Sequence, residues 1–247
     1  MTDYNREFNK LDELLSRREF AEAENYLSAL LERAQSEHDK CGELAVINEQ
    51  IGLFRKLGDS RALERSAYAL RFINDSGIEN GINVATTFLN AGTAYCAFGS
   101  PEKALPCYEK AEEIYNFFLR PNDRRFGALY NNYASAFMAA GDYSRSGDYF
   151  GKALSIMQNA PGGELDCAVT YCNLADLSAK EKGPLESEQE ISSLLERAME
   201  IFNSPSVPHN GYYAFVCEKC ASAFGQHGFF LYEKQLKRRA EEIYERA

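Results

Sequence analysis

Two cysteines, Cys217 and Cys220, stand in the segment "CEKC", and His209 and His227 lie nearby in the sequence. Such a group suggests two kinds of chemistry, a zinc site or a redox-active disulfide. A structural zinc site needs four ligands at workable spacing, and a redox CxxC is placed at a helix N-terminus beside a strand. Here both cysteines fall on the apolar stripe of an amphipathic helix, where cysteine packs as a small hydrophobic residue. We therefore predict structural thiols and no metal site.

The sequence contains no other arrangement that is typical of catalysis. It has three histidines, and none is paired with a nucleophile in a short motif. The segment "APGG" at 160–163 lacks the lysine and the preceding strand of a phosphate-binding loop. The many aromatic residues, 15 tyrosines and 16 phenylalanines, fall mostly on helical stripes and so favour core packing over base stacking. We predict that the protein is not an enzyme, has no catalytic residues and needs no cofactor.

The charge of the chain argues against a nucleic-acid partner. Its 37 acidic and 27 basic residues give a formal net charge of −10, whereas phosphate contacts require a patch rich in lysine and arginine. The one basic cluster, "KQLKRR" at 234–239, is followed by acidic residues and is predicted to be a solvated helix face. The first residues are charged and contain no apolar signal segment, and no stretch reaches the roughly 20 apolar residues of a membrane helix. Together with the seven scattered cysteines, these features predict a cytoplasmic protein with no membrane partner.

The elements that position these residues repeat with a period of about 42 residues. Glycines that end apolar-periodic segments recur at intervals of 41, 42, 42 and 45 residues, at Gly58, Gly99, Gly141, Gly183 and Gly228. A small residue follows twelve positions after three of these glycines, but fifteen positions after Gly183. One insertion of three residues near "PLESEQE" accounts for both the late small residue and the longest interval.

Each unit is predicted to be a helix, a tight turn and a second helix. Phe88, Ala91, Gly92 and Tyr95 follow the i, i+3, i+4, i+7 spacing of one helical stripe, and helix-breaking linkers such as "RPND" separate the units. The fold predicted is all-α, a right-handed α-solenoid of six stacked antiparallel helix pairs without a sheet. It forms a single domain over residues 1–247, with repeats at about 3–38, 40–76, 79–119, 122–160, 163–204 and 208–247.

The repeat resembles a known family. Tyr130, Tyr133, Ala134 and Phe137, followed by "GDY" at 141–143, resemble the tetratricopeptide repeat (TPR). The longer period is similar to that of kinesin light chain and bacterial peptide-pheromone receptors. The likeness is strongest over about 82–158 and weakest in the first two repeats, as is expected of terminal units. It implies a noncatalytic scaffold or adaptor for protein–protein interaction, which binds a peptide segment of a partner in a concave groove lined by the first helix of each repeat.

Positions two residues before and one, two and five residues after the leading aromatic residue of the first helix resemble those that face the groove in this family. Asparagine stands two residues after it in three consecutive repeats, at Asn90, Asn132 and Asn173. An asparagine amide can donate and accept, so it can pair with the backbone of an extended peptide, and the resemblance implies that role. The alternative is that some of these asparagines bond neighbouring helices. The predicted peptide-binding residues are Asn48, Asn90, Thr93, Asn131, Asn132, Ser135, Asn173, Asp176 and Lys219.

Several more specific functions differ in what they require of the chain. A clamp for a C-terminal carboxylate needs lysine and arginine in the groove, and only Lys219 stands at a matching place. A peptide-signal receptor or regulatory module stays an alternative, although such receptors usually carry an effector domain before the repeats and the first helix is expected to begin near residue 4. Self-assembly is the third possibility. It would give a homodimer through the C-terminal helix if Leu231, Leu236 and Ile243 form an apolar outer face.

Overall fold

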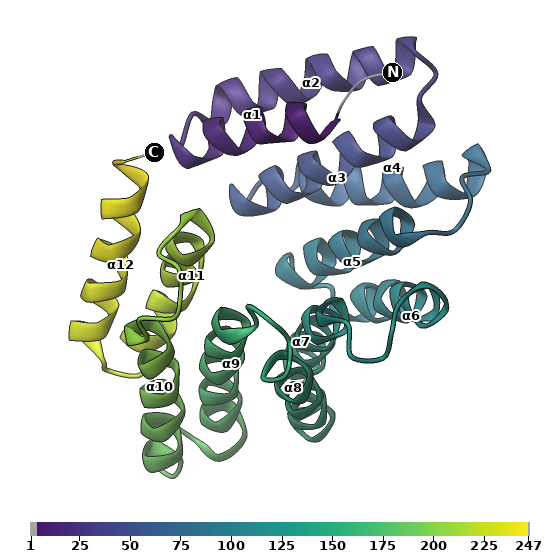
Figure 1. Cartoon of the computed structure of the whole chain (residues 1–247). Helices are drawn as coiled ribbons and strands as arrows, with labels where there is room; N and C mark the ends of the chain where they lie inside the picture. The colour runs from purple at the N-terminus through teal and green to yellow at the C-terminus, as the bar shows by residue number, and fades with distance from the viewer. Residues whose placement is uncertain (1–3, 247) are drawn as a thin grey trace. The chain divides into compact units, whose positions relative to one another are not determined.

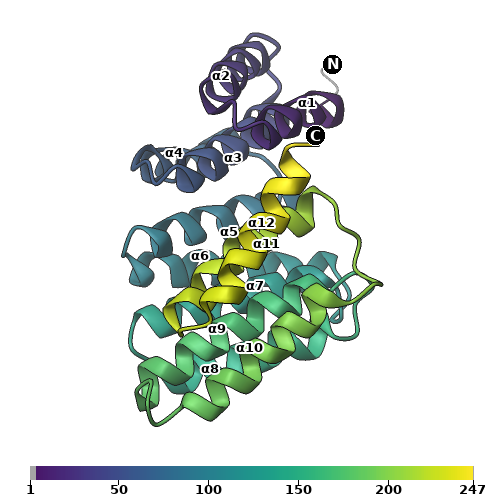
Figure 2. The ribbon, with the colours of Figure 1, turned by 90° about the vertical axis from the view of Figure 1, so that its left-hand side faces the viewer.

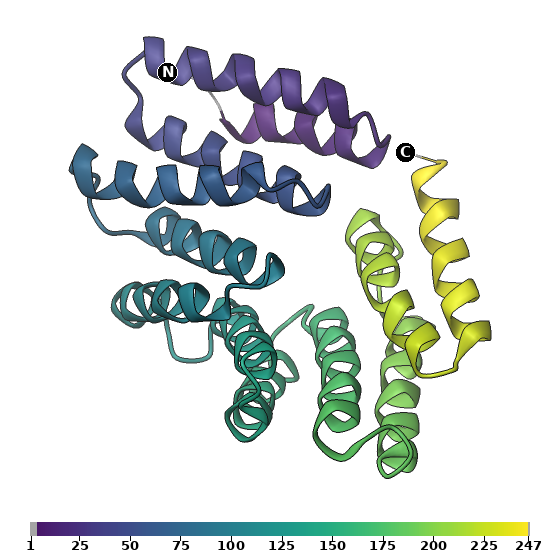
Figure 3. The same ribbon diagram turned by 180° about the vertical axis from the view of Figure 1, so that it is seen from behind.

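The computed structural model describes residues 4–246, in which twelve α-helices and no strand are found (Figure 1). Consecutive helices pair as hairpins, and the same ribbon can be followed from two further sides in Figures 2 and 3. We call the members of each pair its first and second helix. The all-α fold of six helix pairs is confirmed. The pairs are α1 (Tyr4–Ser16) with α2 (Phe20–Ser36), α3 (Lys40–Lys56) with α4 (Arg61–Ser76), α5 (Ile82–Ala97) with α6 (Pro101–Phe118), α7 (Arg124–Ala139) with α8 (Tyr143–Met157), α9 (Glu164–Lys182) with α10 (Glu188–Asn203), and α11 (Gly211–Gln226) with α12 (Phe230–Tyr244).

The helices divide into two compact units, Met1–Arg120 and Pro121–Ala247. The division falls at the start of the "RPND" linker, between α6 and α7. Each unit therefore holds three helix pairs, and each is described by itself below. That all six pairs form one continuous array stays a prediction.

The turn inside each pair depends on a residue with left-handed backbone. Gly58, Gly99, Gly141, Gly183 and Gly228 have φ angles of 67°, 77°, 82°, 89° and 85°, a region that glycine enters without steric cost. The periodic glycines therefore mark the turns, as the sequence predicted. In the first pair this position is taken by Arg18, with φ 57°. That substitution explains why the first repeat gave a weak sequence signal.

In the first unit, α3 packs against α2, α4 and α5. Its buried side chains include Ile47, Ile51 and Phe54. The next pair is held close by Gly92, since a Cβ atom placed there would lie 2.5 Å from the Tyr108 ring. The apolar stripe predicted for the third repeat is thus a contact surface between α5 and α6.

In the second unit, the first helices α7, α9 and α11 lie next to one another in sequence order (Figure 1). α9 is the most enclosed of the three, because both its neighbours and its own partner cover it. α12 is held against this layer by Arg239, whose Nη1 donates to the carbonyl oxygen of Phe202 at 2.8 Å and to the Tyr213 hydroxyl at 2.9 Å.

The condition stated for a homodimer, an apolar outer face on α12, is not met by two of its three residues. Leu236 is 0% exposed, and Ile243 packs against the core of the second unit. Only Leu231, at 84% exposed, points to solvent. The helix turns its apolar stripe inward because it needs that stripe to bind α11, so the residue spacing alone assigned the wrong side.

Candidate functional site

The site is built from the solvent-facing side of α7, α9 and α11 in the second unit, which we call the first-helix face. One polar chain crosses all three helices at their N-terminal ends. Arg124 Nη2 on α7 lies 2.6 Å from Asp166 Oδ2 on α9, and the Tyr212 hydroxyl on α11 donates to Asp166 Oδ1 at 2.6 Å. Burial, followed by this bond to a carboxylate, raises the pKa of Tyr212. The chain of bonds therefore fixes the three helix ends relative to one another.

A second link joins α7 to α9 near their middle. Asn131 Nδ2 donates to Thr170 Oγ1 at 2.7 Å, and the Thr170 hydroxyl reaches the carbonyl oxygen of Asp166 in its own helix at 2.8 Å. Thr170 is 0% exposed. The asparagine amide thus bonds a buried group of the neighbouring helix.

The first unit contains the same arrangement at the same sequence separation of 39 residues. Asn48 Nδ2 donates to Thr87 Oγ1 at 2.8 Å, and Thr87 donates to the carbonyl oxygen of Asn83 at 2.9 Å. Neither threonine is among the predicted peptide-binding residues. The signal was available, because each threonine stands immediately before the leading aromatic residue of the next first helix, Phe88 or Tyr171.

Several predicted groove residues bond within the scaffold. Asn48 is 8% exposed, and its Oδ1 accepts from Asn90 Nδ2 at 3.4 Å. Thr93 Oγ1 donates to the carbonyl oxygen of Leu89 at 2.8 Å, and Ser135 Oγ donates to that of Asn131 at 2.9 Å. The alternative of bonding between helices therefore describes Asn48, Asn90 and Asn131.

Asn132 and Asn173 differ from these residues. Both side chains are half-buried, and within residues 4–246 neither has a hydrogen-bond partner. Asn132 directly follows Asn131, and Asn173 lies one helical turn after Thr170, so the two amides flank the bond that joins their helices. This pair is the one place on the described first-helix face where two amide groups are left for an external ligand.

A third link between helices lies at the C-terminal end of α11, and charged residues border the face. His227 Nε2 lies 2.8 Å from Asp176 Oδ1, which joins the end of α11 to α9. Glu218 and Lys219 are exposed on α11. The face thus presents amides and hydroxyls at its centre and charges of both signs at its edge.

The "CEKC" segment lies in the core. Cys217 and Cys220 are 0% and 2% exposed, and burial raises the pKa of Cys217 to about 12. Such a thiol is protonated and unreactive at neutral pH. Over the described part of the chain, no group of three potential metal ligands is found. The prediction that both cysteines lie on the buried stripe of their helix is confirmed.

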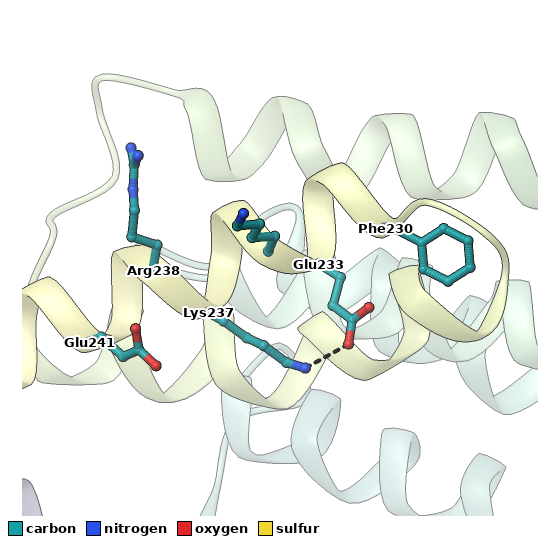
Figure 4. A pocket seen from close by; sticks show the side chains of 6 residues that line it. Phe230, Glu233, Lys237, Arg238 and Glu241 are labelled. Atoms are coloured by element: carbon teal, nitrogen blue, oxygen red, sulfur yellow. Dashed lines mark hydrogen bonds and ion pairs between the residues drawn. The ribbon is translucent and has the colours of Figure 1, made fainter.

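A hollow of about 430 Å³ on α12 is a less suitable site (Figure 4). All its lining residues come from this single helix, and they include Phe230, Lys234 and the ion pair of Lys237 with Glu233 at 2.6 Å. No second helix contributes to this hollow, so a ligand there would be held from one side only.

No described helix combines the length and the apolar character that a bilayer span requires.

Comparison with known proteins gives matches among solved structures alone. No family model matches the chain, and no curated protein matches it. BtubC (BKLC) from P. vanneervenii superimposes with a TM-score of 0.59 at 20% identity, covering 94% of this chain and 91% of that chain. The nearly identical TPR-like repeats of a kinesin light chain from Podosopora anserina superimpose with a TM-score of 0.54 at 16% identity, covering 82% of this chain and 95% of that one. A single-substitution variant of those repeats gives the same values.

Proposed function

We propose that this chain, which has the fold of the TPR-like repeat proteins, is a noncatalytic protein-interaction scaffold that binds an extended peptide segment of a partner. The binding site is the first-helix face of the second unit. One observation carries the proposal: Asn132 and Asn173 keep accessible, unpaired amides on either side of the Asn131–Thr170 bond. Each can donate to a peptide carbonyl and accept from a peptide N–H.

The spacing of the two helices suits an extended chain. Packed helix axes lie about 8–10 Å apart, and an extended peptide advances about 3.3–3.6 Å per residue. Amides on neighbouring helices therefore meet backbone groups about three residues apart. Binding through the backbone places little demand on the ligand's side chains at these two points.

The bonded asparagines have a positioning role in this proposal. Asn131 with Thr170 holds α7 and α9 at a fixed offset, so the free amides of Asn132 and Asn173 are oriented before the ligand arrives. Asn48 with Thr87 makes the corresponding link between α3 and α5 in the first unit. A surface that is ordered in advance loses less conformational entropy on binding. Ser135 adds a hydroxyl oxygen that can still accept a bond, and Asp176 and Lys219 supply charge at the edge. Thr93 lies on α5 of the first unit and is not part of this proposed site. The buried free thiols fit the predicted cytoplasmic location.

The test uses an immobilised array of capped nonapeptides of randomised composition, incubated with the purified chain. The double variant Asn132→Ala/Asn173→Ala should lose at least about 1 kcal/mol of affinity for every peptide captured, which is roughly fivefold, because peptide groups are left unpaired. The matched control is Asn122→Ala/Asn159→Ala, which removes two exposed amides from the linkers of the same unit. Equal binding by the two double variants, with unchanged circular dichroism, would refute the site.

A further inference from the structure

Two aromatic side chains of α11 are exposed on the first-helix face. Tyr212 and Phe215 are each 42% exposed, and their rings stack at 6.4 Å between centroids with 23° between planes. Elsewhere in residues 4–246, large exposed hydrophobic side chains lie on second helices or in turns, and none lies on another first helix. The pair is therefore specific to the face that carries the free amides.

The tyrosine ring is held rigidly by its polar end. Its hydroxyl is bonded to Asp166, and that carboxylate is bonded in turn by Arg124. The Asp166 side chain is only 17% exposed, and hydrogen bonds to a carboxylate are among the strong ones. Because the hydroxyl is already engaged, a ligand meets the ring carbons of the two side chains rather than a free polar group.

We propose that Tyr212 and Phe215 form a subsite for one large apolar side chain, aromatic or branched aliphatic, of the bound peptide. The proposal rests on the proposed function and deepens it by stating what the ligand must carry over α11. Aromatic rings offer a large contact area and gain further from stacked or edge-on contact with another ring. The backbone is held by Asn132 and Asn173, and the subsite selects among sequences that the amides alone accept equally.

The charges around the subsite favour a peptide over a nucleic-acid base. Asp166, Asp176 and Glu218 contribute three carboxylates to the face, against the cations of Arg124 and Lys219. A phosphate backbone would meet net repulsion there, since binding of nucleic acid depends on an excess of basic residues. A peptide with an uncharged backbone does not meet this repulsion.

The dimensions of the face determine the probe. Three packed helices place the outer axes about 20 Å apart, a distance that about six extended residues cover. The probe is a capped nonapeptide of serine, threonine and glycine with a single central tryptophan. The comparison peptide has alanine in place of the tryptophan. The chain itself has no tryptophan, so indole fluorescence reports the peptide alone. We expect a saturable blue shift, and about tenfold weaker binding of the alanine peptide in competition, because that peptide lacks the aromatic contact.

The variant Phe215→Ser should weaken binding of the tryptophan peptide about tenfold and leave binding of the alanine peptide unchanged. The control is Phe117→Ser on α6, a phenylalanine that is 83% exposed on a second helix and should change neither affinity. If both peptides depend on Asn132 and Asn173 but neither responds to Phe215→Ser, the subsite is refuted and the proposed function stands. If neither peptide binds, or if binding ignores the two asparagines, both proposals are refuted.

Discussion

Asn131 and Asn132 are neighbours in sequence, and replacing each by alanine should produce opposite kinds of defect. Successive residues on an α-helix point about 100° apart. Asn131 therefore reaches α9, where it bonds Thr170 at 2.7 Å, while Asn132 has no partner within the described residues. We expect Asn131→Ala to lower stability and Asn132→Ala to lower peptide affinity alone.

The magnitudes follow from burial. Removing Asn131 takes one hydrogen bond from Thr170, which is 0% exposed, so the free energy of unfolding should fall by about 1–2 kcal/mol. Thr170→Val removes the same bond from the other side and should cost a similar amount. Because the two residues share one interaction, the double variant should be more stable than the sum of the single losses predicts, by about 1 kcal/mol. Asn132→Ala should change stability by less than about 0.5 kcal/mol.

The assay is urea unfolding followed by far-ultraviolet circular dichroism, run on the four members of the Asn131/Thr170 cycle. The control cycle is Lys110→Ala with Glu113→Ala, an exposed ion pair at 2.7 Å, for which a coupling of about 0–0.5 kcal/mol is expected. Equal coupling in both cycles would mean that the asparagine bond does not hold α7 to α9. A loss of stability in Asn132→Ala as large as that in Asn131→Ala would contradict the assignment of separate roles.

Two further predictions concern packing and pH. Gly92→Ala should destabilise the chain by about 1–3 kcal/mol, because its Cβ would lie 2.5 Å from the Tyr108 ring, whereas Gly52→Ala, with nothing within 4 Å, should stabilise it by about 0.5–1 kcal/mol. Urea midpoints of the two variants measure the contrast, and a loss at both glycines would contradict it. Burial also raises the pKa of Cys107 to about 11 from 9.0, so the unfolded chain loses its thiol proton first as pH rises. Stability should therefore fall from about pH 9 towards pH 11, and Cys107→Ala should reduce that fall in unfolding free energy. An identical fall in Cys107→Ala would show that this thiol does not contribute.

The repeat architecture could be predicted from the sequence because its signals are local. Each turn glycine has a backbone conformation that other residues rarely adopt, so a single residue in the sequence indicates the turn. The insertion could be located too, since the turn between α9 and α10 spans residues 183–187, longer than the other glycine turns. Where the chain used Arg18 instead of glycine, the local signal was absent and the first repeat was poorly defined.

Which asparagines bond a neighbouring helix and which stay unpaired could not be predicted in the same way. Whether an amide bonds a neighbouring helix or faces solvent depends on the offset and rotation of two helices that are about 40 residues apart in sequence. Asn90 shows the difficulty, because it occupies the same repeat position as Asn132 and Asn173 and yet bonds Asn48. The exposed side of α12 could not be predicted for a related reason, because an apolar stripe alone does not identify the helix against which it packs.

The bonding between first helices also bears on how the repeats keep their order. The position after the leading residue is asparagine in α3 and α7, where it faces a threonine, but leucine in α5 and cysteine in α9. The facing position, directly before the leading residue, is threonine in α5 and α9 but Leu129 in α7 and Val216 in α11, and both of these apolar side chains are buried. An asparagine placed against such an apolar neighbour would leave its amide unsatisfied, at a cost of about 1–3 kcal/mol. Polar and apolar contacts at this one position therefore penalise stacking of the wrong helices, while the next residue along each helix stays available for a ligand.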